Sequence, residues 1–181
     1  MGLTILIVLL GILAVASIFL VLLSARNDLI RQRNELGKAL LNLDQLLKQR
    51  RDELPKLLGT CRSYLQDGSR LLETVTAARA AEQKAVQPPE KARAANDLTQ
   101  ALRNLFAVGD RNASLSLDAS YRQLKKSISG LDDRITTEQA RFNEQASAFN
   151  TRLARVPGSL AARTAGVRPQ PLFSAADPAR D

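Results

Sequence analysis

The chain has 181 residues, 45% of them hydrophobic and 4% aromatic, with no histidine, no tryptophan and one cysteine. Histidine is the usual general base and the commonest metal ligand, and a single cysteine can form neither an intrachain disulfide nor a zinc site, so we expect no catalytic residues, no cofactor and no metal. The net charge of +8 comes from basic residues scattered among acids without interleaved aromatics, which argues against nucleic acid and favours membrane lipid or an acidic protein partner.

The first segment is apolar from Leu3 to Leu23, interrupted only by one threonine, one glycine and one serine. A helix of this length rises about 31 Å, enough to cross a hydrocarbon core of about 30 Å. No positive charge precedes the segment, and its apolar run is too long for a cleavable signal peptide. We therefore expect an uncleaved, single-pass transmembrane anchor over residues 1–24.

Basic residues follow this anchor closely, and none precedes it. They are Arg26, Arg31, Arg33 and Lys38. The positive-inside rule then predicts a cell (inner) membrane protein whose C-terminal domain is cytoplasmic. An external domain remains the alternative, because the rule weakens for long translocated domains.

Beyond the anchor, leucines recur at spacings of seven, four, three, four and seven residues from Leu29 to Leu54. This pattern indicates an amphipathic helix that is continuous, or nearly so, with the anchor. Pro55 is expected to end or redirect it and to open a second helix that runs to about Ala85. Cys61 belongs to the apolar face of that second helix, and we interpret it as a small buried hydrophobe, because no histidine is present to activate it as a nucleophile.

The Pro88-Pro89 pair cannot continue a helix, and a third helix is expected to start there and reach about Phe106. Residues 109–117 are rich in Gly, Asp, Asn and Ser, which predicts an extended connection. Asp118 is a candidate N-cap for the fourth and longest helix, whose hydrophobic stripe continues to Pro157.

Four amphipathic helices joined by short turns can bury their apolar stripes only against one another. The sequence therefore predicts an all-α protein, in which the N-terminal transmembrane helix continues into an antiparallel four-helix bundle over residues 25–157, with coiled-coil-like seams. Residues 158–181 are rich in Ala, Arg and Pro and contain few large hydrophobic residues. They predict a flexible C-terminal tail that could dock at one point.

Two pairs of asparagines share a seven-residue spacing. Asn27 and Asn34 lie on the first soluble helix, and Asn143 and Asn150 lie on the fourth. The start of the first helix faces the end of the fourth in an up-and-down bundle, so we expect the two pairs to meet in a polar rung near the membrane. This rung would fix the register of the helices, because buried amides need partners. The alternative is that it lines a cavity for a small molecule.

Several segments resemble the LemA family. In the N-terminal half they are Asn27–Asn34, Ala39, Leu43-Asp44, Leu47-Lys48, Arg50, Leu54–Leu57, Tyr64 and Glu73–Ala80. Toward the C-terminus they are Asp133–Ile135, Phe142-Asn143, Phe149–Thr151, Val156-Pro157 and Phe173. The resemblance implies an N-terminal membrane helix, a helical-bundle domain and no firmly established molecular activity. The matching positions that it makes structural or recognition candidates are Asn27, Asn34, Asp44, Arg50, Pro55, Asn143 and Asn150.

No set of residues indicates catalysis. Asp132 and Asp133 are adjacent, so their side chains diverge by about 100° on a helix and cannot act together as acid and base. Lys48, Arg50 and Arg51 are candidates for recognition of a partner, although the acids that follow them also predict salt bridges. We expect a non-enzymatic scaffold or adaptor that recruits a protein partner, contacts anionic lipid or self-associates. The alternative is a small-molecule sensor that uses the asparagine-lined cavity.

Overall fold

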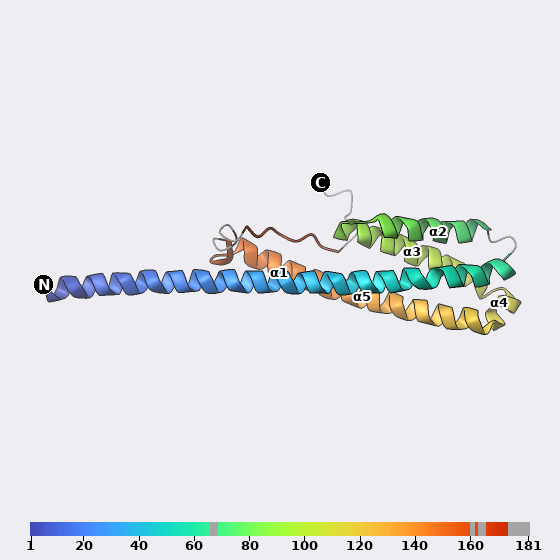
Figure 1. The fold of residues 1–181 in the computed structure, drawn as a ribbon, viewed down its shortest axis with the longest axis horizontal. Coiled ribbons are helices and arrows are strands. Elements are labelled where there is room, and N and C mark those ends of the chain that lie inside the picture. Colours follow the sequence, from blue (N-terminus) through green and yellow to red (C-terminus); the bar gives the residue numbers. More distant parts are fainter. Residues whose placement is uncertain (66–68, 160–161, 163–165, 174–181) are drawn as a thin grey trace. The chain divides into compact units, whose positions relative to one another are not determined.

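A computed structural model of the chain describes residues 1–65, 69–159, 162 and 166–173 (Figure 1). Its helices are α1 (Gly2–Tyr64), α2 (Ser69–Lys84), α3 (Pro88–Gly109), α4 (Ala113–Leu117) and α5 (Ala119–Ala154). No strand occurs within these ranges, which confirms the all-α prediction.

Two compact units divide the chain. Unit 1 comprises Met1–Lys38 and Glu144–Gln170, and unit 2 comprises Ala39–Asn143 and Pro171–Asp181. The start of α1 and the end of α5 therefore belong to unit 1. The remaining parts of these two helices belong to unit 2, together with α2, α3 and α4.

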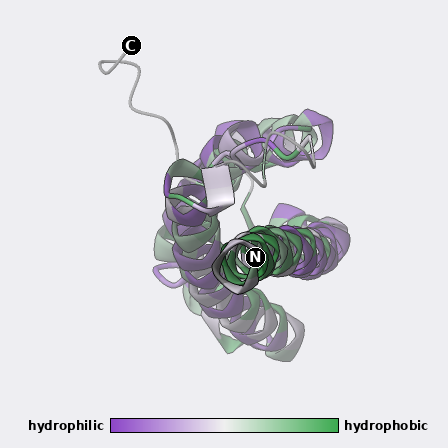
Figure 2. Cartoon of the chain, turned by 90° about the vertical axis from the view of Figure 1, so that its left-hand side faces the viewer, coloured by the Kyte–Doolittle hydropathy of each residue, from purple (hydrophilic) through white to green (hydrophobic). Residues whose placement is uncertain are grey.

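The apolar start of α1 belongs to unit 1 and exposes its side chains. The large hydrophobic residues from Ile5 to Val21 are all more than half exposed, and Figure 2 shows this end of the chain in the hydrophobic colour. Ser17 Oγ donates a hydrogen bond to Leu13 O at 2.8 Å, so this hydroxyl is satisfied within the helix. The segment is long and apolar enough to cross a membrane, which is consistent with a single-pass anchor.

Pro55 lies inside α1, which continues to Tyr64, so the predicted break at this proline is wrong. Proline has no N–H to donate to the carbonyl four residues earlier, which is that of Arg51. Arg79 Nε of α2 donates to Arg51 O at 3.0 Å and replaces the missing helical hydrogen bond. Leu54 beside the proline is fully buried, and its packing also holds this part of α1 in the bundle.

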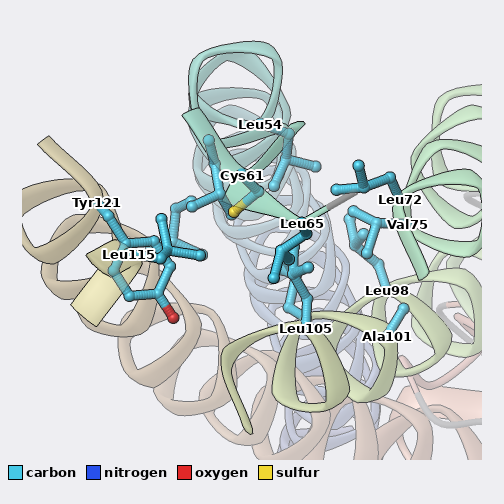
Figure 3. Close-up of a cluster of buried hydrophobic side chains, with 13 residues drawn as sticks. Leu54, Cys61, Leu65, Leu72, Val75, Leu98, Ala101, Leu105, Leu115 and Tyr121 are labelled. Carbon is cyan, nitrogen blue, oxygen red and sulfur yellow. The ribbon is translucent and has the colours of Figure 1, made fainter. Parts of the chain in front are cut away.

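The core of unit 2 is formed by leucines, smaller side chains and Tyr121 (Figure 3). Its members are Leu54, Leu57, Cys61, Leu65, Leu72, Val75, Leu98, Ala101, Leu102, Leu105, Leu115, Tyr121 and Ile128. They come from every helix of the unit, and the helical-bundle prediction is confirmed. Cys61 is fully buried among them, as expected for a small hydrophobe.

The connection predicted as extended over residues 109–117 instead contains the short helix α4. Asn112 caps this helix, since its side chain accepts a hydrogen bond from Leu115 N at 2.9 Å. Leu115 is fully buried, so its burial in the core favours a helical turn over an extended chain. Gly109 ends α3 close to the Tyr121 hydroxyl, where any Cβ would overlap the phenol.

Asp118 begins α5 as predicted. Its Oδ1 accepts a hydrogen bond from Tyr121 N at 2.8 Å, and its Oδ2 accepts one from the Tyr64 hydroxyl at 3.0 Å. These hydrogen bonds stabilise the carboxylate and lower the pKa of Asp118 below its usual value. One side chain therefore caps α5 and ties it to the end of α1.

Part of the C-terminal segment predicted as a flexible tail is packed. Val167 and Phe173 are buried, and the burial of Phe173 agrees with docking through one large hydrophobic residue. The remainder of the predicted tail that falls on residues 160–161, 163–165 and 174–181 lies outside the described residues.

Candidate functional site

Arg50 is the centre of a buried polar cluster in unit 2. Its guanidinium forms ion pairs with Glu82 of α2 and Asp132 of α5. It also donates to Thr99 Oγ1 at 2.8 Å and to Ala95 O at 3.4 Å, both on α3. One side chain thus joins α1 to three other helices. A buried charge is tolerated only when it is paired in this way.

The cluster is electrically balanced. Arg51 Nη1 lies 3.2 Å from the second oxygen of Glu82, so two arginines face two carboxylates. Among the buried side-chain nitrogen and oxygen atoms of the described residues, only Arg50 Nε has no hydrogen-bond partner. Since each charge has its counter-charge inside the protein, the arrangement favours a structural role for these groups.

The three basic residues that are candidates for recognition, Lys48, Arg50 and Arg51, therefore differ in their exposure to solvent. Lys48 is exposed, Arg51 is half-buried against Glu82, and Arg50 is fully buried. Arg50 was a candidate for a structural or a recognition role, and the enclosure of its guanidinium by carboxylates favours the structural one. Glu82 was not identified from the sequence, and Asp132 was considered only as a member of an adjacent carboxylate pair. Their positions next to the apolar stripes of α2 and α5 are the signal that could have identified them.

A small charged cavity lies beside this cluster. It has a volume of about 270 Å³, and Lys91 Nζ is held at its edge by both oxygens of Asp44, at 2.7 and 2.8 Å. The cavity is lined by Asp44, Leu47, Lys48, Arg51, Glu82, Gln83, Ala85 and Lys91. Its acids are engaged by basic residues, and no group of three or more potential metal ligands occurs in the described part of the chain.

A polar groove runs along α1 and α5 in unit 2. It consists of two adjoining hollows of about 430 and 730 Å³, which share Gln49 and Arg134. The other lining residues are Asn42, Gln45, Leu46, Asp52, Glu53, Gln123, Lys126, Ser127, Gly130, Leu131, Asp133, Thr137 and Glu138. The side chains of Gln45, Gln49 and Arg134 make no hydrogen bond or ion pair with any other described residue. Their donors and acceptors are free to bind a partner.

Asn143 and Asn150 do not form the predicted rung with Asn27 and Asn34, whose side chains are exposed. Each instead pairs with the backbone of the C-terminal segment. In unit 1, Asn150 donates to Gln170 O at 2.9 Å and accepts from Gln170 N at 2.8 Å. The prediction of a buried polar rung, and of a small-molecule cavity lined by it, is therefore wrong.

In unit 2, Asn143 makes the same pair of hydrogen bonds with Phe173. Its side-chain amide donates to Phe173 O at 3.0 Å and accepts from Phe173 N at 2.6 Å. The Phe173 ring packs edge-on against Phe142, with ring centroids 6.4 Å apart. Seven helical residues rise about 10.5 Å and three extended residues span about 10 Å. The spacing of the two asparagines along α5 therefore matches that of their partners along the tail.

Cys61 is the one thiol of the chain and lies in the core of unit 2. Burial raises its pKa to about 11, because the apolar surroundings disfavour the thiolate. The thiolate is the reactive form, so this environment suppresses nucleophilic chemistry at the sulfur.

The sequence profile of the LemA family matches residues 39–181, more than three quarters of the chain. The match takes in the whole helical core of unit 2 and begins after the apolar start of α1. No protein with a curated description matches the sequence significantly. On the extent of the family match, the chain belongs to the LemA family.

Proposed function

We propose that this protein is a non-enzymatic scaffold, anchored in the cell (inner) membrane by the start of α1, which recruits a protein partner to its cytoplasmic unit 2. The polar groove along α1 and α5 is the observation that carries this proposal. It offers unpaired amides and charges of both signs in two adjoining hollows.

The composition of the groove suits a polar, charged partner surface. Arg134 lies in both hollows, while Asp52, Glu53 and Asp133 provide acidic groups along the same path. Interfaces with both signs of charge select partners by electrostatic complementarity. A helix or loop that carries matching charges would satisfy donors and acceptors that water satisfies in the free protein.

The buried polar groups support a role without catalysis. Arg50 is enclosed by the two carboxylates that neutralise it, and the pKa of Cys61 is raised away from the range of a reactive thiol. Perturbed groups at enzyme active sites usually face a cleft that admits a substrate. Arg50 and Cys61 lie inside the bundle, among the contacts that hold its helices together.

The cytoplasmic orientation rests on charge next to the anchor. Arg26, Arg31 and Arg33 are exposed in the first turns beyond the apolar segment, whereas no basic side chain precedes that segment. Basic residues beside a span are retained on the cytoplasmic side during insertion. A cytoplasmic unit 2 would expose the groove to cytoplasmic proteins, which supports the proposal.

Proximity labelling of the full chain tests recruitment. A labelling enzyme is fused after Asp181, and the parent is compared with a groove variant that combines Gln49→Ala and Arg134→Glu. The matched control combines Asn96→Ala and Arg103→Glu, which change an exposed amide and an exposed arginine of α3 outside the groove.

We expect a reproducible set of labelled proteins that is lost in the groove variant and kept in the α3 control. The charge reversal should weaken binding by about tenfold or more if Arg134 pairs with a partner acid. Identical labelling by all three proteins would contradict recruitment through this groove.

A further inference from the structure

A small cavity in unit 1 lies just beyond the apolar start of α1. It has a volume of about 200 Å³ and is formed by about two turns of α1, by the last turn of α5 and by the residues that directly follow α5. The lining residues are Ala25, Asp28, Leu29, Gln32, Arg152, Arg155, Val156, Pro157 and Gly158.

The depth of this cavity follows from its distance along α1. Ala25 and Asp28 are two and five residues beyond Leu23, the end of the apolar segment, so they rise about 3 and 7.5 Å above it. The headgroup layer of a bilayer is about 5–8 Å thick on each side of the hydrocarbon core. With the apolar segment inserted, the part of the α1 wall nearest the membrane, at Ala25 and Asp28, therefore lies at headgroup depth.

The charges around the cavity favour an anion. Arg152, in the last turn of α5, and Arg155, just after the end of that helix, are exposed and are not ion-paired with any described residue. Asp28 is the acid that lines the cavity, and its Oδ1 already lies 3.1 Å from Arg31 Nη2. Unit 1 as a whole has eight basic and three acidic residues, so five of the eight net positive charges belong to it.

The same cavity has an apolar side. Val156 is 75% exposed next to the two arginines, and Leu29 is buried at the cavity wall. Gly158 lets the chain turn tightly here, because a Cβ at this position would overlap the Arg152 carbonyl oxygen. Cations and an exposed aliphatic side chain at one site match a ligand with a charged group on an apolar body.

We propose that this cavity binds the headgroup of an anionic phospholipid, whose phosphate contacts Arg152 and Arg155 while its glycerol and upper acyl carbons contact Val156. Arginine is suited to this role because its planar guanidinium forms paired hydrogen bonds with phosphate oxygens. The inference rests on the proposed membrane anchoring, and it adds a specific lipid class and a defined site to it.

Fluorescence quenching by brominated lipids tests the site in the full chain. The protein has no tryptophan, so Val156→Trp introduces a single indole at the cavity. The protein is inserted into vesicles in which either phosphatidylglycerol or phosphatidylcholine is brominated, at equal mole fraction. The site variant adds Arg152→Glu and Arg155→Glu, and the control adds Arg70→Glu and Arg103→Glu on exposed positions of unit 2.

We expect stronger quenching by brominated phosphatidylglycerol than by brominated phosphatidylcholine in the parent and in the control. The preference should fall at least about fivefold in the site variant, because each interfacial cation contributes about 1 kcal/mol. Vesicle flotation shows whether each protein is anchored. Flotation without a phosphatidylglycerol preference, or with a preference unchanged in the site variant, would overturn the lipid site alone. Failure to float would overturn the anchoring on which it rests.

Discussion

Arg50 shows how a charged side chain can organise the interior of a bundle. Its guanidinium is fully buried, yet it contacts two carboxylates, a hydroxyl and a carbonyl from three helices. Buried ion pairs add little net stability when intact, because desolvation offsets their attraction. Removing one member costs far more, since the remaining charges stay buried without a partner.

Replacement of Arg50 by alanine should therefore destabilise the bundle strongly. We expect a loss of about 3–5 kcal/mol, because Glu82 and Asp132 would lose their shared counter-ion. The exposed neighbouring change Lys48→Ala should cost less than about 0.5 kcal/mol. Urea unfolding of the full chain in detergent micelles, followed by circular dichroism, measures both. Equal losses for the two variants would contradict the role given to the cluster.

Cys61 makes the stability of unit 2 depend on alkaline pH. Its pKa is about 11 in the folded protein and about 9 in an unfolded chain, so folding favours the protonated thiol. The resulting stabilisation is complete below about pH 9 and is lost as the pH rises toward 11. Tyr121 shifts in the same direction, since burial and the nearby Asp110 raise the pKa of its hydroxyl.

The melting temperature should fall between about pH 9 and pH 11, and it should fall by less in Cys61→Ala than in the parent chain. The variant retains Tyr121, so the difference between the two proteins isolates the thiol. Alkylation of Cys61 at pH 8 should also be slow until denaturant is added. Rapid alkylation of the folded chain would show that the sulfur is accessible.

For single residues, core and helix-cap positions were easier to predict than long-range ion-pair partners. Cys61 and Asp118 take the predicted roles of core residue and helix cap, because each role depends on local sequence and periodicity. Arg50 was a candidate for a structural or a recognition role. Its burial depends on Glu82 and Asp132, which lie 32 and 82 residues away, and no local pattern specifies such a pairing.

At the scale of elements, periodic leucines specified the helices well but not where each one ends. Proline normally interrupts a helix, yet α1 passes through Pro55 because Arg79 of the next helix satisfies the carbonyl that proline leaves free. The short α4 was missed because one buried leucine and an asparagine cap outweigh a run of turn-forming residues. In both places a contact distant in sequence, or a single buried side chain, overrides local propensity.

The compensation between Arg79 and Pro55 predicts a non-additive pair of substitutions. Arg79→Ala should destabilise the bundle by about 1–3 kcal/mol, because the Arg51 carbonyl loses its donor. In a Pro55→Ala background the helix supplies that donor itself, so the same substitution should cost less by about 1 kcal/mol. A double-mutant cycle from urea unfolding measures this coupling. Strict additivity would rule out the compensation.

For the whole molecule, the sequence indicated the long apolar N-terminal helix and the helical bundle because both depend on average hydrophobicity and periodicity. It did not indicate the packed C-terminal segment. Asn143 and Asn150 contact backbone atoms of that segment, and backbone atoms leave no side-chain pattern to recognise. The sequence suggested only docking at one point, and Phe173, the last large hydrophobic residue of the chain, is buried as such a point would be.

The proposed orientation predicts the behaviour of reporters fused after Asp181. A fluorescent protein that matures in the cytoplasm should be bright, and alkaline phosphatase, which requires an oxidising compartment, should be inactive. Moving the basic residues from the C-terminal to the N-terminal side of the apolar segment should reduce the fraction of chains with a cytoplasmic C-terminus. A variant with Arg26, Arg31 and Arg33 changed to glutamine and three lysines inserted after Met1 should show increased phosphatase activity. Active phosphatase in the unaltered chain would reverse the orientation.

The hydrogen bonds between the α5 asparagines and the C-terminal backbone also determine which positions of this contact tolerate substitution. Asn150 binds the N–H and C=O of residue 170, so the contact does not depend on the side chain at that position. Every residue except proline supplies the required N–H. Position 150 needs one side-chain donor and one acceptor in a fixed, short geometry, which asparagine provides. Substitutions should therefore be tolerated at position 170 and selected against at position 150, although the two residues bind each other.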